Sequence, residues 1–189
     1  MIPGPDYYIA LLHYPVFNRH GNIVTTAVAN MDIHDMARAA RTYGMRRYCI
    51  VTPIAAQRVL VQTILDHWQQ GYGAAYNVSR KEAFDRVCVQ ETFAMVVADI
   101  EALAGRRPRV VVTGASLTGN LISFEKIKTI LEKDDHPCLI VWGTGWGLAE
   151  EIVAEADYSL EPVRGVGSDY NHLSVRSAAA VILDRLFGA

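Results

Sequence analysis

The sequence LIVWGTGWG, residues 139–147, joins a run of large apolar residues to a glycine-rich turn. Such a run is typical of a strand that is buried on both faces, as strands of parallel sheets are. Glycines just past a strand let backbone groups approach a ligand without interference from a Cβ atom. A second glycine-bearing segment, LEPVRGVG at residues 160–167, leads toward the last predicted helix. Together the two segments predict a pocket lined mainly by backbone.

Outward from this stretch, apolar runs alternate with segments of helical periodicity. Besides the run at 139, strands are predicted at residues 7–13, 48–52, 87–89, 109–113 and 158–160. Helices are predicted at residues 30–43, 54–70, from 79, 91–103, 123–133, 148–156 and 173–187. This alternation favours an α/β fold, a mostly parallel sheet with helices on both faces. Residues 71–89 fit the pattern less well and are interpreted as an insertion or an irregular crossover.

Residues at several predicted helix ends suit capping roles. Asn30 is expected to be the N-cap of the first helix, with Gly44 as its C-terminal stop. Ser79 and Glu82 have the spacing of a capping box, which predicts a helix start. Ser174 is expected to cap the last helix with its hydroxyl.

The composition indicates a globular protein with a substantial core. Of the 189 residues, 51 % are hydrophobic and 20 % charged, which favours a folded chain over a disordered one. We expect a single domain over residues 1–189. No apolar run approaches the roughly 18 residues of a membrane span, and residues 1–6 do not resemble a signal peptide. A cytoplasmic protein without membrane association is therefore expected.

Charge and cysteine usage disfavour several kinds of site. The formal net charge of −2 gives no overall attraction to nucleic acid, although arginines cluster at residues 38–47 and 106–109. Cys49, Cys88 and Cys138 are far apart, without metal or disulfide spacing, and are expected to be structural. No two histidines have the i, i+4 spacing of a metal-binding helix, so no metal site is expected.

The glycine-rich turn differs from the common nucleotide-binding motifs. It follows a strand and opens a helix, but its spacing is not G-x-G-x-x-G and it lies near the end of the chain. The sequence also lacks a G-x-x-x-x-G-K-[ST] phosphate loop and a G-x-S-x-G elbow. A nicotinamide enzyme is therefore not favoured. Trp142 and Trp146 flank the glycines and suit either stacking on a ligand ring or core packing.

Taken in chain order, three motifs resemble those of the SPOUT class of S-adenosylmethionine-dependent RNA methyltransferases. These motifs are an Asn and a helical Arg before an aromatic-Gly pair, a strand ending in a Gly-rich turn, and a Pro-containing loop before the last helix. They are matched here by Asn30, Arg38 and Tyr43-Gly44, by residues 139–148, and by residues 160–165 with 171–174. The resemblance covers nearly the whole chain and is closest to a small bacterial branch without a separate RNA-binding domain.

The resemblance implies a fold and a cofactor. SPOUT enzymes tie their C-terminal half in a deep trefoil knot, so a knot is expected here. S-adenosylmethionine is expected to lie in the loops of this knot, held mainly by backbone. The residues implied to bind it are Thr113, Gly114, Trp142, Gly143, Thr144, Gly145, Trp146, Gly147, Leu160, Pro162, Val163, Leu173 and Ser174.

The same resemblance implies catalytic residues and partners. Arg38 is expected to contact the target phosphate or activate the nucleophile, with Asp32 and Asn30 as accessory polar groups; a solvated helix arginine is the alternative for Arg38. The implied substrate is RNA, either tRNA or rRNA. The implied assembly is a homodimer with the active site between subunits, with which the apolar last helix, residues 173–187, is compatible.

Two positions depart from the family pattern. Members that methylate ribose 2′-hydroxyls usually have a Glu where Gly145 stands, and Asn171 comes one place early, with His172 at the usual position. The target atom therefore stays open between a ribose oxygen, a ring nitrogen and a base carbon, and the sequence names neither the RNA nor a general base. A non-catalytic nucleotide- or ligand-binding α/β protein is the alternative function.

Overall fold

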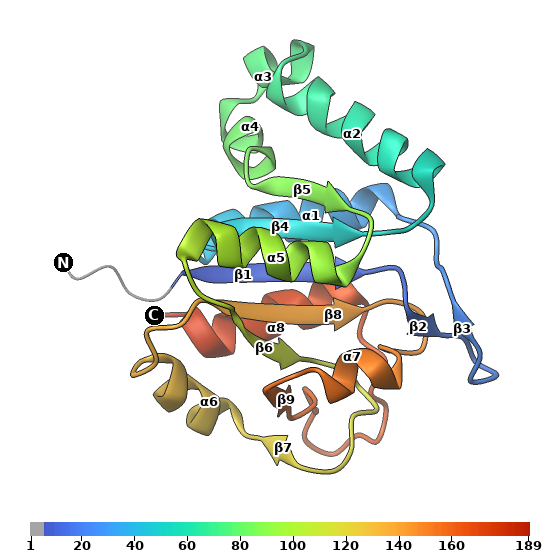
Figure 1. Cartoon of the computed structure of the whole chain (residues 1–189), viewed down its shortest axis with the longest axis vertical. Coiled ribbons are helices and arrows are strands. Elements are labelled where there is room, and N and C mark those ends of the chain that lie inside the picture. The colour runs from blue at the N-terminus through green and yellow to red at the C-terminus, as the bar shows by residue number, and fades with distance from the viewer. Residues whose placement is uncertain (1–5) are drawn as a thin grey trace.

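The computed structural model describes residues 6–189 and shows one seven-stranded sheet with helices on both faces (Figure 1). The sheet order is β5-β4-β1-β8-β6-β9-β7, and every neighbouring pair is parallel. The strands are β1 (Tyr7–Leu12), β4 (Arg47–Val51), β5 (Val87–Gln90), β6 (Arg109–Val112), β7 (Leu121–Ile122), β8 (Cys138–Gly143) and β9 (Tyr158–Leu160). The predicted parallel α/β sheet is confirmed.

The helices divide between the two faces because successive strand residues point to opposite sides. The helices are α1 (Asn30–Thr42), α2 (Ala55–Gln69), α3 (Tyr72–Tyr76), α4 (Val78–Phe84), α5 (Phe93–Ala104), α6 (Phe124–Leu131), α7 (Glu150–Ala154) and α8 (Val175–Phe187). Ile9, Ile140 and Trp142 face a core with α1, α2, α4, α6 and α8, whereas Ala10 and Val141 face α5 and α7. Strands β1, β4, β5, β6 and β8 all end at the right in Figure 1, so their C-terminal loops gather there.

Of the three N-terminal capping predictions two are wrong and one is confirmed, and Gly44 follows the C-cap of α1 with φ of +73°, as expected of a C-terminal stop. Asn30 is the first residue of α1, and Ala29 occupies the N-cap without a side-chain cap. Asn77, rather than Ser79, caps α4 by accepting a hydrogen bond from the Arg80 N–H at 2.9 Å. Ser174 caps α8 as expected, accepting from the Ser177 N–H at 3.3 Å.

The segment after β1, which the sequence indicates as a loop, forms a short hairpin. Its strands are β2 (Val16–Phe17) and β3 (Ile23–Val24), which pair antiparallel. Strands of two residues are too short to show alternation, so periodicity cannot reveal them. The hairpin projects beyond the C-terminal edge of the sheet (Figure 1). Among the described residues, no helix has the length and apolar character needed to cross a membrane.

Candidate functional site

A cavity of about 1060 Å³ opens at the C-terminal ends of β6, β8 and β9. Its walls come from the loops that follow these strands and from the start of α8. The predicted cofactor residues that line it are Thr113, Gly114, Trp142, Gly143, Thr144, Gly145, Trp146, Gly147, Pro162, Val163, Leu173 and Ser174. Leu160 does not line it, because its side chain is buried in the core beneath β9. The fold therefore brings the two glycine-bearing segments together around one cavity.

The glycine-rich turn has no room for side chains at two positions. A Cβ atom at Gly143 would lie 2.9 Å from the Leu148 backbone nitrogen. At Gly145, where φ is +59°, a Cβ atom would lie 2.8 Å from the Phe17 carbonyl oxygen. A glutamate at position 145 is therefore excluded by sterics and by backbone conformation. The turn presents backbone to the cavity because neighbouring backbone packs against its outer side.

The hairpin provides that neighbouring backbone. The Phe17 N–H donates to the Gly147 carbonyl at 2.8 Å, and the Trp146 N–H donates back to the Phe17 carbonyl at 2.9 Å. Below them, the Thr26 and Thr144 hydroxyls lie 2.5 Å apart. Phe17 and Thr26 both line the cavity. The sequence does not predict this part of the cavity wall, because the two-residue strands of the hairpin have no recognisable pattern.

A buried histidine supports the same wall. His13 Nδ1 lies 3.0 Å from the Thr26 hydroxyl, and its Nε2 has no partner among the described residues. Burial disfavours the charged ring and lowers the pKa of His13 to about 4. The imidazole is therefore neutral at physiological pH and fixes the Thr26 side chain.

The cavity also holds a charged pair that joins α1 to α8. The Arg176 guanidinium donates to Asp32 Oδ1 at 2.7 Å and lies 3.3 Å from Asp35. The Asp32 side chain is only 9 % exposed, and both Asp32 and Arg176 line the cavity. A carboxylate buried to this extent needs a compensating cation, and Arg176 supplies it. Sequence reasoning found Asp32 but missed Arg176, which is an unmarked arginine in the first turn of the last helix.

The other two predicted catalytic residues lie elsewhere. Asn30 and Arg38 are exposed on α1, and neither lines the cavity within this chain. The reason is helical geometry. At about 100° per residue, positions 30 and 38 fall on faces of α1 different from that of Asp32. Of the three predicted catalytic residues only Asp32 lines the cavity, and the roles inferred for Asn30 and Arg38 stay predictions.

An unpaired donor lies in the cavity wall. Trp142 is 3 % exposed and lines the cavity, yet its indole Nε1 has no hydrogen-bond acceptor within residues 6–189. A buried N–H without an acceptor costs about 1–3 kcal/mol, so such groups in native proteins call for an explanation. The Nε1 atom is covered by the residues around it, so a ligand in the cavity does not reach it in this conformation.

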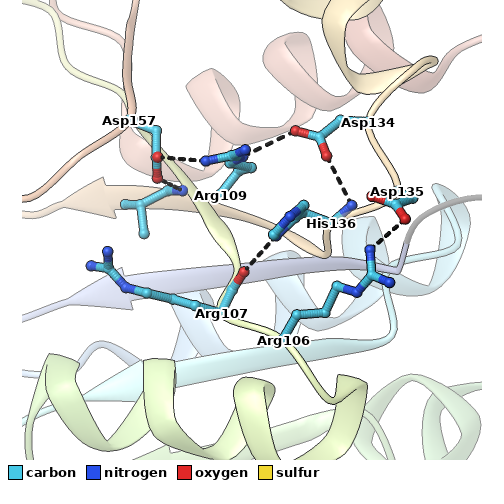
Figure 2. Close-up of polar contacts among 8 residues, drawn as sticks. Arg106, Arg107, Arg109, Asp134, Asp135, His136 and Asp157 are labelled. Carbon is cyan, nitrogen blue, oxygen red and sulfur yellow. Dashed lines mark hydrogen bonds and ion pairs between the residues drawn. The ribbon is translucent and has the colours of Figure 1, made fainter.

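A second charged cluster lies at the opposite, N-terminal edge of the sheet (Figure 2). Arg109 bridges Asp134 at 3.0 Å and Asp157 at 3.3 Å, and Arg106 pairs with Asp135. Burial raises the pKa of Asp134, but the His136 N–H and Arg109 outweigh it, so that the net pKa is lowered. This cluster ties the loop before β8 to β6 and β9, and each of its carboxylates already has an arginine partner.

Comparison with protein families and curated proteins identifies relatives across nearly the full chain. A family model described as SAM-dependent RNA methyltransferase matches residues 6–188. An uncharacterized protein from Aquifex aeolicus is 43 % identical over 96 % of this chain and 88 % of its own. A tRNA (guanine-N(1)-)-methyltransferase from Nitratidesulfovibrio vulgaris is 41 % identical over 98 % of this chain but only 43 % of its own. The chain therefore spans less than half of that relative.

Solved structures share the fold at low sequence identity. A probable methyltransferase from Bordetella pertussis superposes with a TM-score of 0.64 at 13 % identity, over 96 % of this chain and 94 % of its own. The SpoU methyltransferase AviRb from Streptomyces viridochromogenes, in complex with AdoMet, gives 0.60 at 17 % identity, over 99 % of this chain and 58 % of its own. At these identities the likeness concerns the fold alone.

Proposed function

The chain belongs to the family of SAM-dependent RNA methyltransferases, and we propose that its cavity holds S-adenosylmethionine for methyl transfer to an RNA nucleotide. The residues that hold the cofactor are those of the two glycine-bearing segments that line the cavity. When bound, the cofactor supplies an electrophilic methyl group on a sulfonium.

The glycine-rich turn carries this proposal. Gly143 and Gly145 are kept free of side chains by backbone packed behind them, so backbone lines the cavity at this turn. The N–H groups of Thr144, Trp146 and Gly147 are bonded within the fold, whereas the Gly145 N–H has no backbone acceptor among the described residues. Backbone groups around a cavity of this size suit a ligand with adenine, ribose and carboxylate groups, as S-adenosylmethionine has.

Asp32 is the proposed proton acceptor for the reaction. Methyl transfer demands a correctly placed nucleophile, and a nucleophile that carries a proton must lose it to a nearby base. Asp32 is the buried carboxylate of the cavity, and Arg176 fixes its orientation through a 2.7 Å hydrogen bond. Arg176 is therefore a proposed positioning residue, since it acts through Asp32.

The choice of target is a further part of the proposal. We propose a base ring nitrogen in tRNA or rRNA, because Gly145 excludes a side chain at the position where ribose-directed relatives have a glutamate. A ring nitrogen that carries a proton also gives Asp32 a role. The curated relative named for guanine N1 in tRNA supports tRNA, but more than half of that protein lies outside the match. Its activity is therefore not transferred to this chain.

We also propose a homodimer with a knotted cofactor site, as the family resemblance implies, and a cytoplasmic, single-domain protein, as length and composition indicate. Exposed apolar side chains on the loop before α8 support the dimer. Val166 and Tyr170 are highly exposed there, and Leu173 is half exposed. A second subunit that covers these side chains would remove them from water and close the mouth of the cavity. Sedimentation of the purified protein tests the dimer.

The proposed function is tested by transfer of a radiolabelled methyl group to bulk tRNA and rRNA, followed by nucleoside mass spectrometry. The expected result is one methylated base nucleoside. In parallel, S-adenosylmethionine should raise the melting temperature, whereas NAD and ATP should not. Absence of stabilisation by millimolar S-adenosylmethionine or S-adenosylhomocysteine would overturn the methyltransferase assignment. Stabilisation without transfer to any RNA would favour the non-catalytic ligand-binding alternative.

A further inference from the structure

The β2–β3 hairpin has features that its role as a cavity wall does not explain. The hairpin arm, residues 16–24, projects from the C-terminal edge of the sheet and carries Arg19 and His20 at its tip (Figure 1). Both side chains are exposed. The wall needs only the base of the arm, where Phe17 meets the glycine-rich turn.

The arm lies in an unusually non-acidic part of the chain. Between Asp6 and Asp32 the sequence contains no Asp or Glu, although the protein as a whole is net negative. Arg19 forms no ion pair with any carboxylate among residues 6–189. Its Nε instead donates to His20 Nε2 at 3.0 Å, so the guanidinium keeps its outer N–H groups for another partner. A cation held this way suits an anion from outside the molecule.

The tip is held in one conformation by its own residues. The Asn18 side-chain oxygen accepts the N–H groups of His20 at 2.8 Å and Asn22 at 3.0 Å. The backbone N–H of Asn18 donates to the Asn22 carbonyl at 2.9 Å. Gly21 completes the turn with φ of +77°, which only glycine adopts without strain. A rigid tip loses little conformational entropy when a ligand binds to Arg19.

The base of the arm presents an aromatic ring beside the cavity. Trp146 donates its backbone N–H to Phe17 and is 62 % exposed at the cavity mouth. Trp146 lies at the base of the arm whose tip carries Arg19. Proteins bind unpaired nucleotides by stacking a base on an exposed aromatic ring while a cation contacts the phosphate. The arm, the ring and the cavity are joined by the hydrogen bonds between Phe17 and the glycine-rich turn.

We propose that the hairpin arm is the RNA-binding element of this protein: Arg19 binds a backbone phosphate next to the target nucleotide, and Trp146 stacks on an unpaired base at the cavity mouth. This inference rests on the proposed function, since it takes RNA as the substrate. It explains how a net acidic chain binds a polyanion, because the phosphate meets a local cation without acidic residues nearby in sequence. The substrate class is then a loop or single-stranded RNA segment.

The test compares RNA affinity across variants at position 19, with a fluorescently labelled stem–loop RNA measured by anisotropy. Arg19→Gln is expected to weaken binding about threefold to tenfold and to reduce the salt slope of log K by about 0.7, the value for one lost phosphate contact. Arg19→Glu should weaken binding further, and Arg19→Lys should retain most of it. Trp146→Ala should also weaken binding, with a smaller change in the salt slope, because stacking involves no charge.

Arg107→Gln is the matched control. Arg107 is exposed and lies at the opposite edge of the sheet, just before β6 (Figure 2). It is expected to leave RNA affinity unchanged. Equal losses for Arg107→Gln and Arg19→Gln would overturn the proposal, because they would mean diffuse charge attraction. Wild-type affinity in Arg19→Glu would overturn it as well, as would a change in sedimentation without a change in RNA affinity, which would make the arm an interface between copies.

Titration with S-adenosylhomocysteine separates this inference from the proposed function. The Arg19 variants are expected to bind it as the wild type does and to melt at the same temperature, because the tip lies outside the cavity lining. Intact binding of S-adenosylhomocysteine with unchanged RNA affinity in every Arg19 variant would refute the arm and leave the methyltransferase proposal standing. Failure of the wild type to bind S-adenosylhomocysteine would refute the proposed function itself.

Discussion

The two edges of the sheet carry charged clusters of similar composition in very different surroundings. At the N-terminal edge, Arg106 and Arg109 pair with the aspartates around them (Figure 2). At the C-terminal edge, Asp32 and Arg176 pair with each other in the lining of a cavity of about 1060 Å³. Charged residues alone therefore do not mark a site. The C-terminal edge differs in having a cavity beside its charged pair.

The largest effect should come from breaking the charged pair at the cavity. Asp32→Asn removes the proposed proton acceptor and is expected to lower methyl transfer about 100-fold or more. Affinity for S-adenosylhomocysteine should stay within about twofold of the wild type, which a calorimetric titration measures. The matched change at the other edge, Asp134→Asn, should leave transfer unaltered. Equal loss of transfer in both variants would mean that Asp32 acts through stability alone.

Next in size is the pH dependence of protein stability that results from the burial of His13 in the cavity wall. Its pKa is about 4 in the folded chain against an ordinary 6.5, so the unfolded state binds the extra proton. Stability is therefore full above pH 6.5 and is lost as pH falls toward 4, by about 3 kcal/mol. Urea unfolding at several pH values should show this slope, and His13→Gln should reduce it. An unchanged slope in the variant would show that His13 is not the titrating group.

A smaller effect is expected at the glycine-rich turn. Gly145→Ala places a Cβ atom 2.8 Å from the Phe17 carbonyl oxygen, so hairpin and turn must separate. We expect a loss of about 2 kcal/mol in stability together with weaker binding of S-adenosylhomocysteine. Gly105→Ala is the control, because Gly105 also has a positive φ but has nothing within 4 Å. It should lose about 1 kcal/mol and keep wild-type affinity.

The smallest effect belongs to the N-terminal cluster. Asp134→Asn is expected to lower the free energy of unfolding by about 1 kcal/mol, because its bridge to Arg109 is partly exposed. Thermal unfolding in low and high salt measures this, and the difference from wild type should shrink at high salt. A loss of RNA methylation in this variant would give the N-terminal edge a function and break the contrast between the two edges.

Much of the fold followed from the sequence because its strands are buried and continuous. Three predicted strands match β4, β6 and β8, namely those at residues 48–52, 109–113 and 139–142. Each of their ends lies within one residue of the observed end. The β2–β3 hairpin could not be predicted from the sequence, because its pairing depends on backbone hydrogen bonds to the distant Gly147 and to its own turn. Short strands of this kind have no periodic signature.

The site was predictable to the extent that it is built from backbone. Glycines after a strand mark a ligand-facing turn, and the cavity lies there. The pairing of Asp32 with Arg176 was not predictable, because it joins residues 144 positions apart in the sequence on two helices. The requirement for glycine at position 145 has a second cause that sequence reasoning missed, the approach of the Phe17 carbonyl oxygen.

The cavity at the C-terminal edge is the proposed S-adenosylmethionine site. A crystal structure of the protein with S-adenosylhomocysteine would test this proposal. We expect the ligand between the glycine-rich turn and the start of α8. Ligand density at any other place on the chain, with this cavity empty, would contradict the assignment.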